Sequence, residues 1–381
     1  MRNIVVYFGI MFLPDKNALC QRAKSILKSA KELGYETVAI GVSDEVEVGT
    51  YRKQILGKEI YYEVCYPTNI YEWINHLTSS KEIIEIIREI GCEKVKSFIV
   101  ADYRFIPTVQ MNEFCKKEGI NFVADIMDWF IPGNDIISLI KQIDTALRIH
   151  LIYPKIERKI CICTNFAKKY KSTKYMQIIP GTVDINDSKW PVSSCRLEEN
   201  FVNLIFAGQP GKKCKKEKID WVIRAMYNVD TNRKLNLYLL GVEEGIFKKE
   251  NPKLCKYIEK INIHFIGKVD HLKCIEMISN ADFSLVVRAK NRLSEYGFST
   301  KISEAFACGT AVLATDTSDV KLYVKNTING FVCNSSYVGV ECMIKQILKL
   351  SREEIRSMNE KVRENNKLIF SEYTELLRKV L

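Results

Sequence analysis

Residues 282–315 read DFSLVVRAKNRLSEYGFSTKISEAFACGTAVLAT, and this stretch predicts the unit from which the chain is built. Its ends, DFSLVV and AVLAT, are short apolar runs typical of strands that are buried on both faces. Between them, Ser299 is suited to cap a helix that begins at Thr300, runs to Cys308 and ends at Gly309. A strand, a helix and a second strand in this order indicate a parallel sheet.

The same alternation of apolar strands and helix-like segments occurs twice along the chain. Strand-like runs in the first half lie at 3–8, 36–41, 97–101, 121–125 and 159–164, and those of the second half begin with VNLIFAG, LNLYLLG and INIHFIG. The clearest helix is NALCQRAKSILKSAKEL, which has one apolar stripe and is closed by Gly34. Two such arrays predict an α/β chain with two Rossmann-like domains, each built on a parallel sheet.

Turn-forming residues between Ile179 and Asp187 mark the domain boundary. The prediction is an N-terminal domain over 1–180, a C-terminal domain over 181–355, and C-terminal helices over 356–381 that pack back on the N-terminal domain. Open parallel sheets bind ligands at the carboxyl ends of their strands. We therefore expect the functional residues in a cleft between the two domains.

The composition excludes several classes of protein. A chain of 381 residues with 47% hydrophobic and 27% charged residues is globular, and no apolar run is long enough to cross a bilayer. The N-terminal sequence reaches charge and proline too early for a secretory signal, so a cytoplasmic location is expected. The 13 cysteines include no Cys-x-x-Cys pair. They indicate reduced thiols rather than disulfides or a zinc site.

Positive charge is concentrated in two segments of a chain whose formal net charge is +11. Nine Lys or Arg residues and two acidic residues lie between Lys141 and Lys174, and five lysines lie between Lys212 and Lys218. A solvated basic surface accounts for such clusters as readily as binding of anionic lipid, nucleic acid or phosphate-bearing substrates. Charge alone does not decide among these alternatives.

The loop after the first strand of the predicted C-terminal domain, AGQPGKKCKKEK at 207–218, is a candidate phosphate site. Gly208 would allow close approach of the backbone to a ligand, and Lys212, Lys213 and Lys216 would supply charge beside a helix start. The spacing differs from that of a P-loop. A lysine-rich surface turn remains the alternative.

Arg288 follows the strand DFSLVV directly, where a fixed, bidentate cation would suit a phosphate group. The helix start formed by Ser299, Thr300 and Lys301 offers backbone N–H groups to the same diphosphate. Glu304 lies one turn further, on the face of Thr300, where a carboxylate could accept both hydroxyls of a ribose. The alternative is that Glu304 points to water, but its apolar neighbours argue against full exposure.

Two aspartates, Asp125 and Asp128, follow a strand of the first domain in the sequence VADIMDWF. Either could orient a substrate hydroxyl, act as a base, or cap the next helix.

These segments resemble retaining glycosyltransferases of family four, of the bacterial type that builds surface polysaccharides. The resemblance runs from Arg288 through GFSTKISEAFACGTAVLATDTSD to NGFVC, and includes LPDKNALCQRAKSILKSAKELGYE, ADIMDWF and IIPGTVD. It implies the two-domain GT-B fold. It also implies transfer of a sugar from a nucleoside diphosphate sugar to a lipid-linked or other glycan acceptor, as in a hexosyltransferase, with retention of anomeric configuration.

The resemblance assigns roles only to matching residues. Glu304 takes the ribose-binding position, and Gly9 matches the glycine after the first strand, near donor and acceptor. The family's upstream glutamate falls on Tyr296, with Glu295 one position away. Its usual arginine after the first strand of the second domain is Gln209, so Lys212, Lys213 or Lys216 must substitute, together with Arg288.

Catalysis is assigned on the same basis to Arg288, Lys213 and Asp128, the last of which lies in the region where many members place a histidine. No Asp-x-Asp motif occurs, so we expect a metal-independent enzyme with no cofactor besides the donor substrate. Stabilisation of the departing diphosphate by lysines, Arg288 and helix amides would lower the barrier. A lipid-linked acceptor would place the enzyme at the inner face of the membrane as a peripheral protein, with the segment Lys141 to Lys174 facing the lipid.

Two other functions remain open from the sequence. A nucleotide-sugar epimerase would share the fold and the donor site but needs an acid and base pair in the cleft. A nucleic-acid-binding protein would account for the charge. However, base-stacking modules interleave aromatic and basic residues, and 212–218 contains no aromatic residue, so we expect no nucleic-acid partner.

Overall fold

The computed structural model describes residues 2–14, 17–57, 59–129, 136–190, 200–230, 232 and 234–381. The chain forms two compact units, called here the first and second unit. The first comprises Met1–Val183, Tyr296–Phe298 and Phe370–Leu381, and the second comprises Asp184–Glu295 and Ser299–Ile369. The expected boundary near 180 lies close to this division. The expected break at 355 instead falls inside helix α15 (Arg352–Glu364), which belongs to the second unit.

The described part of the first unit contains an eight-stranded sheet in the order β3-β4-β2-β1-β5-β6-β7-β8. Its strands are β1 (Ile4–Phe8), β2 (Glu36–Ser43), β3 (Tyr51–Leu56), β4 (Glu59–Cys65), β5 (Val95–Ala101), β6 (Asn121–Ile126), β7 (Arg158–Cys161) and β8 (Tyr175–Ile178). All neighbouring pairs are parallel except β3 and β4. The predicted parallel sheet is therefore present in this unit, with one antiparallel strand, β3, at its edge. Strand β3 lies at the sheet edge and is largely exposed, so it lacks the continuous apolar run that marks the buried strands.

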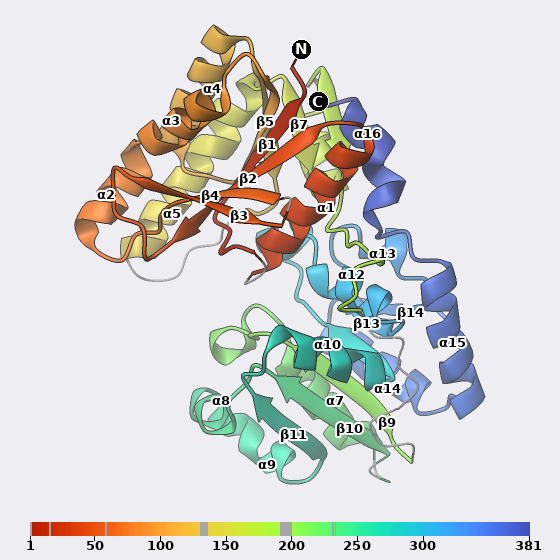
Figure 1. Cartoon of the computed structure of the whole chain (residues 1–381). Coiled ribbons are helices and arrows are strands. Elements are labelled where there is room, and N and C mark those ends of the chain that lie inside the picture. Colours follow the sequence, from red (N-terminus) through yellow and green to blue (C-terminus); the bar gives the residue numbers. More distant parts are fainter. Residues whose placement is uncertain are drawn as a thin grey trace. The chain divides into compact units, whose positions relative to one another are not determined.

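Helix α1 (Ala18–Glu32) shows how the local sequence sets the packing of the first unit. The Asn17 side chain accepts a hydrogen bond from the N–H of Cys20 and so caps the helix. Ala23, Ile26 and Ala30 lie buried on one stripe of α1, as predicted. Helix α16 (Thr374–Arg378) packs beside α1 (Figure 1). Its Leu377 joins the same core.

The other helices of the first unit are α2 (Ile70–Thr78), α3 (Lys81–Ile90), α4 (Phe105–Glu118), α5 (Ile136–Leu147) and α6 (Thr164–Lys169). Helix α5 is followed by a short π-helix over Arg148–Ile152 and a 3-10 helix over Tyr153–Lys155. A further 3-10 helix, Phe370–Tyr373, precedes α16.

The second unit is built on a six-stranded parallel sheet in the order β11-β10-β9-β12-β13-β14. Its strands are β9 (Val202–Ala207), β10 (Leu235–Leu240), β11 (Asn262–Gly267), β12 (Phe283–Val286), β13 (Ala311–Thr315) and β14 (Gly330–Cys333). Its helices are α7 (Ile219–Val229), α8 (Glu244–Glu250), α9 (Cys255–Ile258), α10 (His271–Asn280), α11 (Arg292–Glu295), α12 (Thr300–Ala307), α13 (Val320–Tyr323), α14 (Tyr337–Ile347) and α15, with 3-10 turns at Lys212–Cys214 and Pro252–Leu254. Because the strands are parallel, the loops after β9, β10 and β12 leave from the same edge of the sheet.

Among the described residues, no helix is both long and apolar enough to cross a bilayer.

Candidate functional site

The loop after β9 lies beside the start of α12. Gly208 begins this loop with a φ of 126°, in the region that favours glycine. Its N–H donates to the carbonyl oxygen of Leu240 at 3.0 Å, which extends the β9–β10 pairing by one residue. A Cβ atom at Gly208 would lie 3.4 Å from Cε of Lys301. The fold therefore brings together two segments that the sequence analysis assigned separately to phosphate binding.

Two of the predicted cations, Arg288 and Lys301, converge on one carboxylate, Glu217. Nε and Nη2 of Arg288 donate to Oε1 of Glu217 at 3.0 and 2.8 Å, and Nζ of Lys301 donates to the same oxygen at 2.9 Å. The Glu217 side chain is fully buried, whereas those of Arg288 and Lys301 are 13% and 16% exposed. Within the described residues, Oε2 of Glu217 has no hydrogen-bond partner. The three residues form a compact charged group at the edge of the sheet where the strands have their carboxyl ends. Arg288 and Lys301 are called here the cation pair.

The charges of this group alter one another's ionisation. Burial raises the pKa of the Glu217 carboxyl, but the charges of Lys301 and Arg288 outweigh it, so the pKa lies below its usual value. Burial lowers the pKa of the Lys301 ammonium, against the attraction of Glu217, and the charges of Arg288 and Lys216 lower it further. An incoming anion would relieve this repulsion and stabilise the charged form of Lys301.

The backbone of Arg288 is held by the neighbouring strands. Its N–H donates to the hydroxyl of Thr315 at 2.7 Å, and its carbonyl oxygen accepts from the hydroxyls of Thr315 and Ser335. Nη2 of Arg288 also donates to Oγ of Ser299 at 3.3 Å. These contacts fix the guanidinium at the end of β12, where a bidentate cation was expected.

Ser299 occupies the N-cap position of α12, as predicted, but its hydroxyl accepts from Arg288 rather than from the helix backbone. The expected side-chain cap is therefore wrong, because the neighbouring guanidinium takes the hydroxyl. Thr300 and Glu304 lie one turn apart on α12, and both are partly buried. Burial, and then the charge of Glu304, raise the pKa of the Cys274 thiol on α10 to about 11. This interaction places Glu304 on the side of α12 that faces α10.

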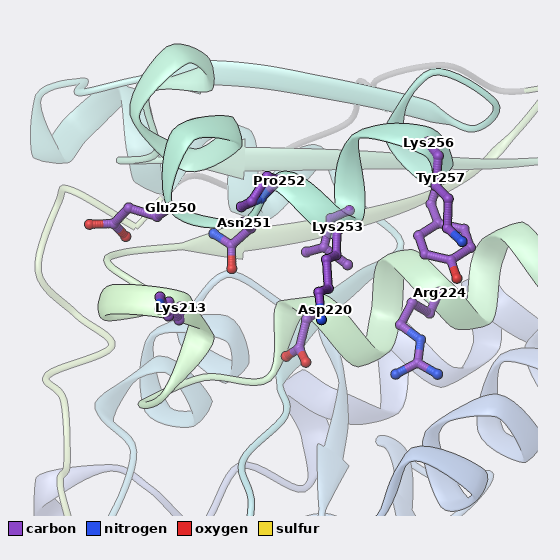
Figure 2. A pocket seen from close by; sticks show the side chains of 10 residues that line it. Lys213, Asp220, Arg224, Glu250, Asn251, Pro252, Lys253, Lys256 and Tyr257 are labelled. Carbon is purple, nitrogen blue, oxygen red and sulfur yellow. The ribbon is translucent and has the colours of Figure 1, made fainter.

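The lysines after Gly208 do not form one group. Lys216 is exposed and acts on Lys301 through its charge, and Lys212 is also exposed. Lys213, at a φ of 52°, lines a cavity of about 730 Å³ together with side chains that include Asp220, Arg224 and Tyr257 (Figure 2). The lining of this cavity includes neither Arg288 nor Lys301. Lys213 therefore has a left-handed backbone conformation, and its side chain lies apart from the cation pair.

Asp125 of the first unit belongs to a buried ion pair. Arg22 donates to it through Nη2 at 2.6 Å and Nε at 2.8 Å, and the Tyr7 hydroxyl donates to Oδ2 at 2.7 Å. Arg22 also donates to the carbonyl oxygens of Ile179 and Pro180 at 3.0 and 2.9 Å. Asp125 therefore ties helix α1 to strand β6 through Arg22.

Asp128, the other predicted aspartate, is exposed and has its backbone held by Asp102. Oδ2 of Asp102 accepts from the N–H groups of Met127 and Asp128 at 2.9 and 2.8 Å. Gly9 follows β1, and a Cβ there would lie 2.9 Å from Cδ2 of Leu19, too close for any larger residue without a shift. The packing around Gly9 is therefore tight, and a larger residue there would have to displace the Leu19 side chain.

The sequence analysis did not identify Glu217 or Asp102. Glu217 stands alone among lysines, and an acidic residue in such a run reads as a solvated charge. The signal for Asp102 was its place directly after a buried strand, the same signal that identified Arg288. Within the described residues, no group of three or more His, Cys, Asp or Glu is placed to hold a metal ion.

The comparisons with known proteins agree with this architecture. Residues 202–353 match the family model described as glycosyl transferases group 1. A search of curated proteins found no match. Sucrose-phosphate synthase from Thermosynechococcus elongatus is similar in structure, with a TM-score of 0.72, 12% sequence identity, and coverage of 99% of this chain and 97% of that one.

Two further structures of similar fold carry nucleotides. The E. coli trehalose-6-phosphate structure bound with UDP-2-fluoro glucose has a TM-score of 0.64 and 10% identity, and the match covers all of both chains. Anabaena Alr3699/HepE, in complex with UDP and glucose, has a TM-score of 0.64 and 10% identity, and the match covers 99% of each chain. The chain therefore has a GT-B-type fold, and its residues 202–353 are similar to the glycosyl transferases group 1 family.

Proposed function

We propose that the chain is a retaining glycosyltransferase of the hexosyltransferase type, which uses a nucleoside diphosphate sugar without a metal ion. The observation that carries the proposal is the convergence of Arg288 and Lys301 on the buried Glu217, beside the backbone of Gly208. Two partly exposed cations at a strand edge suit a diphosphate. The group 1 glycosyl transferase domain and the nucleotide-bound structures of similar fold support the same assignment.

In this proposal, the cation pair stabilises the departing diphosphate. The bond between the anomeric carbon and the diphosphate oxygen breaks, and the acceptor oxygen forms its bond on the same face of the sugar. The proton of the acceptor hydroxyl passes to the departing diphosphate. Negative charge grows on the diphosphate during this step. Arg288 and Lys301 are already held by Glu217, so they require little reorganisation as that charge develops.

We place the remaining donor contacts on the residues next to the cation pair. The amide groups at the start of α12, with Ser299 and Thr300, receive the diphosphate, and Glu304 accepts the ribose hydroxyls. Lys212 and Lys216 add exposed positive charge on the loop that follows Gly208. We leave Lys213 out of the donor set, because its side chain lines the separate cavity of Figure 2.

The acceptor side belongs to the first unit. We propose that Asp128 orients an acceptor hydroxyl, since the residue lies at the surface and its backbone N–H is held by Asp102. Gly9 would leave room for backbone contact with the substrates. A lipid-linked glycan at the inner membrane face, used in cell-surface polysaccharide synthesis, is the proposed acceptor class.

Replacing Glu304 with alanine is expected to weaken donor binding by about 1.5–3 kcal/mol, which corresponds to roughly a ten- to hundredfold rise in Kd. The reason is loss of a charged acceptor for the ribose hydroxyls. Isothermal titration with the preferred nucleoside diphosphate sugar measures this change. Glu276→Ala on α10, where the carboxylate is about half exposed and paired with Lys273, is the matched control. Equal donor affinity for wild type and Glu304→Ala would refute the ribose assignment.

A further inference from the structure

Helix α5 buries the polar residues Asp144 and Thr145 and leaves several of its apolar residues exposed. Asp144 accepts from the N–H of Phe105 at 2.7 Å and pairs with Nε of Arg148 at 3.0 Å. Arg148 in turn donates to Asp102 at 3.0 Å and to Thr145 at 3.1 Å. These side chains are buried and paired inside the first unit. A helix on the surface of a globular protein normally has the opposite orientation.

From Leu139 onward, α5 carries an outward stripe of apolar side chains. Leu139 and Ile143 are 53% and 52% exposed, Ile140 lies between them, and Leu151 continues the stripe on the following π-helix. Helix α2 repeats the arrangement, since His76 is buried against the Tyr103 hydroxyl while Ile70 is 81% exposed. Tyr71 and Ile74 share the outer side of α2 with Ile70.

The two outward stripes belong to one surface. Nζ of Lys141 on α5 lies 5.5 Å from the ring centre of Trp73 on α2, which makes the two helices neighbours. The exposed residues Ile70, Tyr71, Ile74, Leu139, Ile140, Ile143 and Leu151 are called here the α2–α5 apolar surface. An apolar surface of this extent on a folded chain marks an interaction site.

Positive charge lies near the C-terminal end of α5. The Trp129 ring lies 5.7 Å from His150, just beyond α5, and Nζ of Lys169 lies 5.2 Å from the same ring. Exposed lysines continue along this segment at 155, 168, 169, 171 and 174, against one exposed acidic residue, Glu157. Arg148 and Lys159, which the sequence analysis counted in the membrane-facing cluster, are buried and cannot take part.

We propose that the α2–α5 apolar surface docks on an anionic lipid bilayer, with its apolar side chains in the interface and the nearby lysines on the head groups. Apolar side chains next to basic ones, with the acidic group paired internally, match the chemistry of surface-bound amphipathic helices. If a second copy of the chain docked here instead, the lysines near this surface would need acidic partners on that copy. The inference rests on the first unit alone and does not depend on the proposed transferase activity.

The test is co-sedimentation of the full chain with phosphatidylcholine vesicles that contain or lack phosphatidylglycerol. Wild type is expected to bind the anionic vesicles. The triple variant Leu139→Ser, Ile140→Ser, Ile143→Ser should bind about tenfold more weakly or worse, since three apolar side chains no longer enter the interface. Lys168→Gln with Lys169→Gln should weaken binding to anionic vesicles and leave residual binding to neutral ones unchanged.

The matched control is Ile246→Ser, Leu272→Ser, Val338→Ser, which removes three apolar side chains of similar exposure from the second unit. It should bind vesicles as wild type does. Unchanged melting temperatures and donor affinity of the α5 variant would show that only the surface was altered. Equal vesicle binding of the α5 variant and wild type would overturn the proposal. A second result would also overturn the proposal. In that result, wild type does not bind vesicles but forms a dimer, seen by sedimentation velocity, and the α5 variant does not form this dimer.

Discussion

Replacing Arg288 with leucine is expected to lower turnover by about a hundred- to a thousandfold, because the departing diphosphate loses its bidentate cation. Lys301 would remain, but it would no longer compete with Arg288 for Glu217. That carboxylate would therefore hold Lys301 more tightly. Turnover should therefore fall more than donor affinity. Initial-rate kinetics that separate kcat from KM measure the effect.

Two variants control for charge and for folding. Arg288→Lys keeps the charge but loses the planar fork, so its turnover should lie between those of wild type and Arg288→Leu. Lys290→Met removes a cation from the same loop whose side chain is 57% exposed, and it should leave turnover nearly unchanged. A rate for Arg288→Leu close to that of wild type, in protein with a normal melting temperature, would remove Arg288 from the catalytic group.

Replacing Asp125 with alanine is expected to lower the free energy of unfolding by about 3–5 kcal/mol. Arg22 is 3% exposed, so its charge would remain buried without its carboxylate partner. The hydroxyl of Tyr7 would lose its acceptor as well. Urea unfolding followed by circular dichroism measures the change.

The double variant Arg22→Leu, Asp125→Leu should be less destabilised than Asp125→Ala, because it removes both charges together. Glu113→Ala, at an exposed pair with Lys116, should change stability little. If Asp125→Ala unfolds at the same urea concentration as Glu113→Ala, the buried pair does not hold helix α1 to β6.

The alternating apolar runs predicted most of the parallel strands of both units, because strands buried on both faces carry a local signal. Strands β3, β4, β8 and β14 were not predicted, since short strands and partly exposed strands near a sheet edge lack that signal. The order of strands and loops along the sequence also predicted that Arg288 and Gly208 follow the ends of strands, and the structure has them there.

Residues defined by tertiary contacts could not be predicted in the same way. Glu217 becomes buried only because Arg288 and Lys301 reach it from segments 71 and 84 positions away. The periodicity of α5 is visible in its sequence, but a pattern cannot tell which face points inward. The burial of Asp144 and Arg148 depends on Asp102, which lies on a different segment.

The measurement that tests the central claim most directly is a thermal-shift screen of wild type and Arg288→Leu against a panel of nucleoside diphosphate sugars. A ligand that binds the folded chain at a hundred times its Kd stabilises it by about 2.7 kcal/mol, enough for a clear rise in melting temperature. The account predicts such a rise for wild type with at least one donor, and a much smaller rise for Arg288→Leu. A panel in which no donor shifts the wild type, or in which both proteins shift equally, would contradict it.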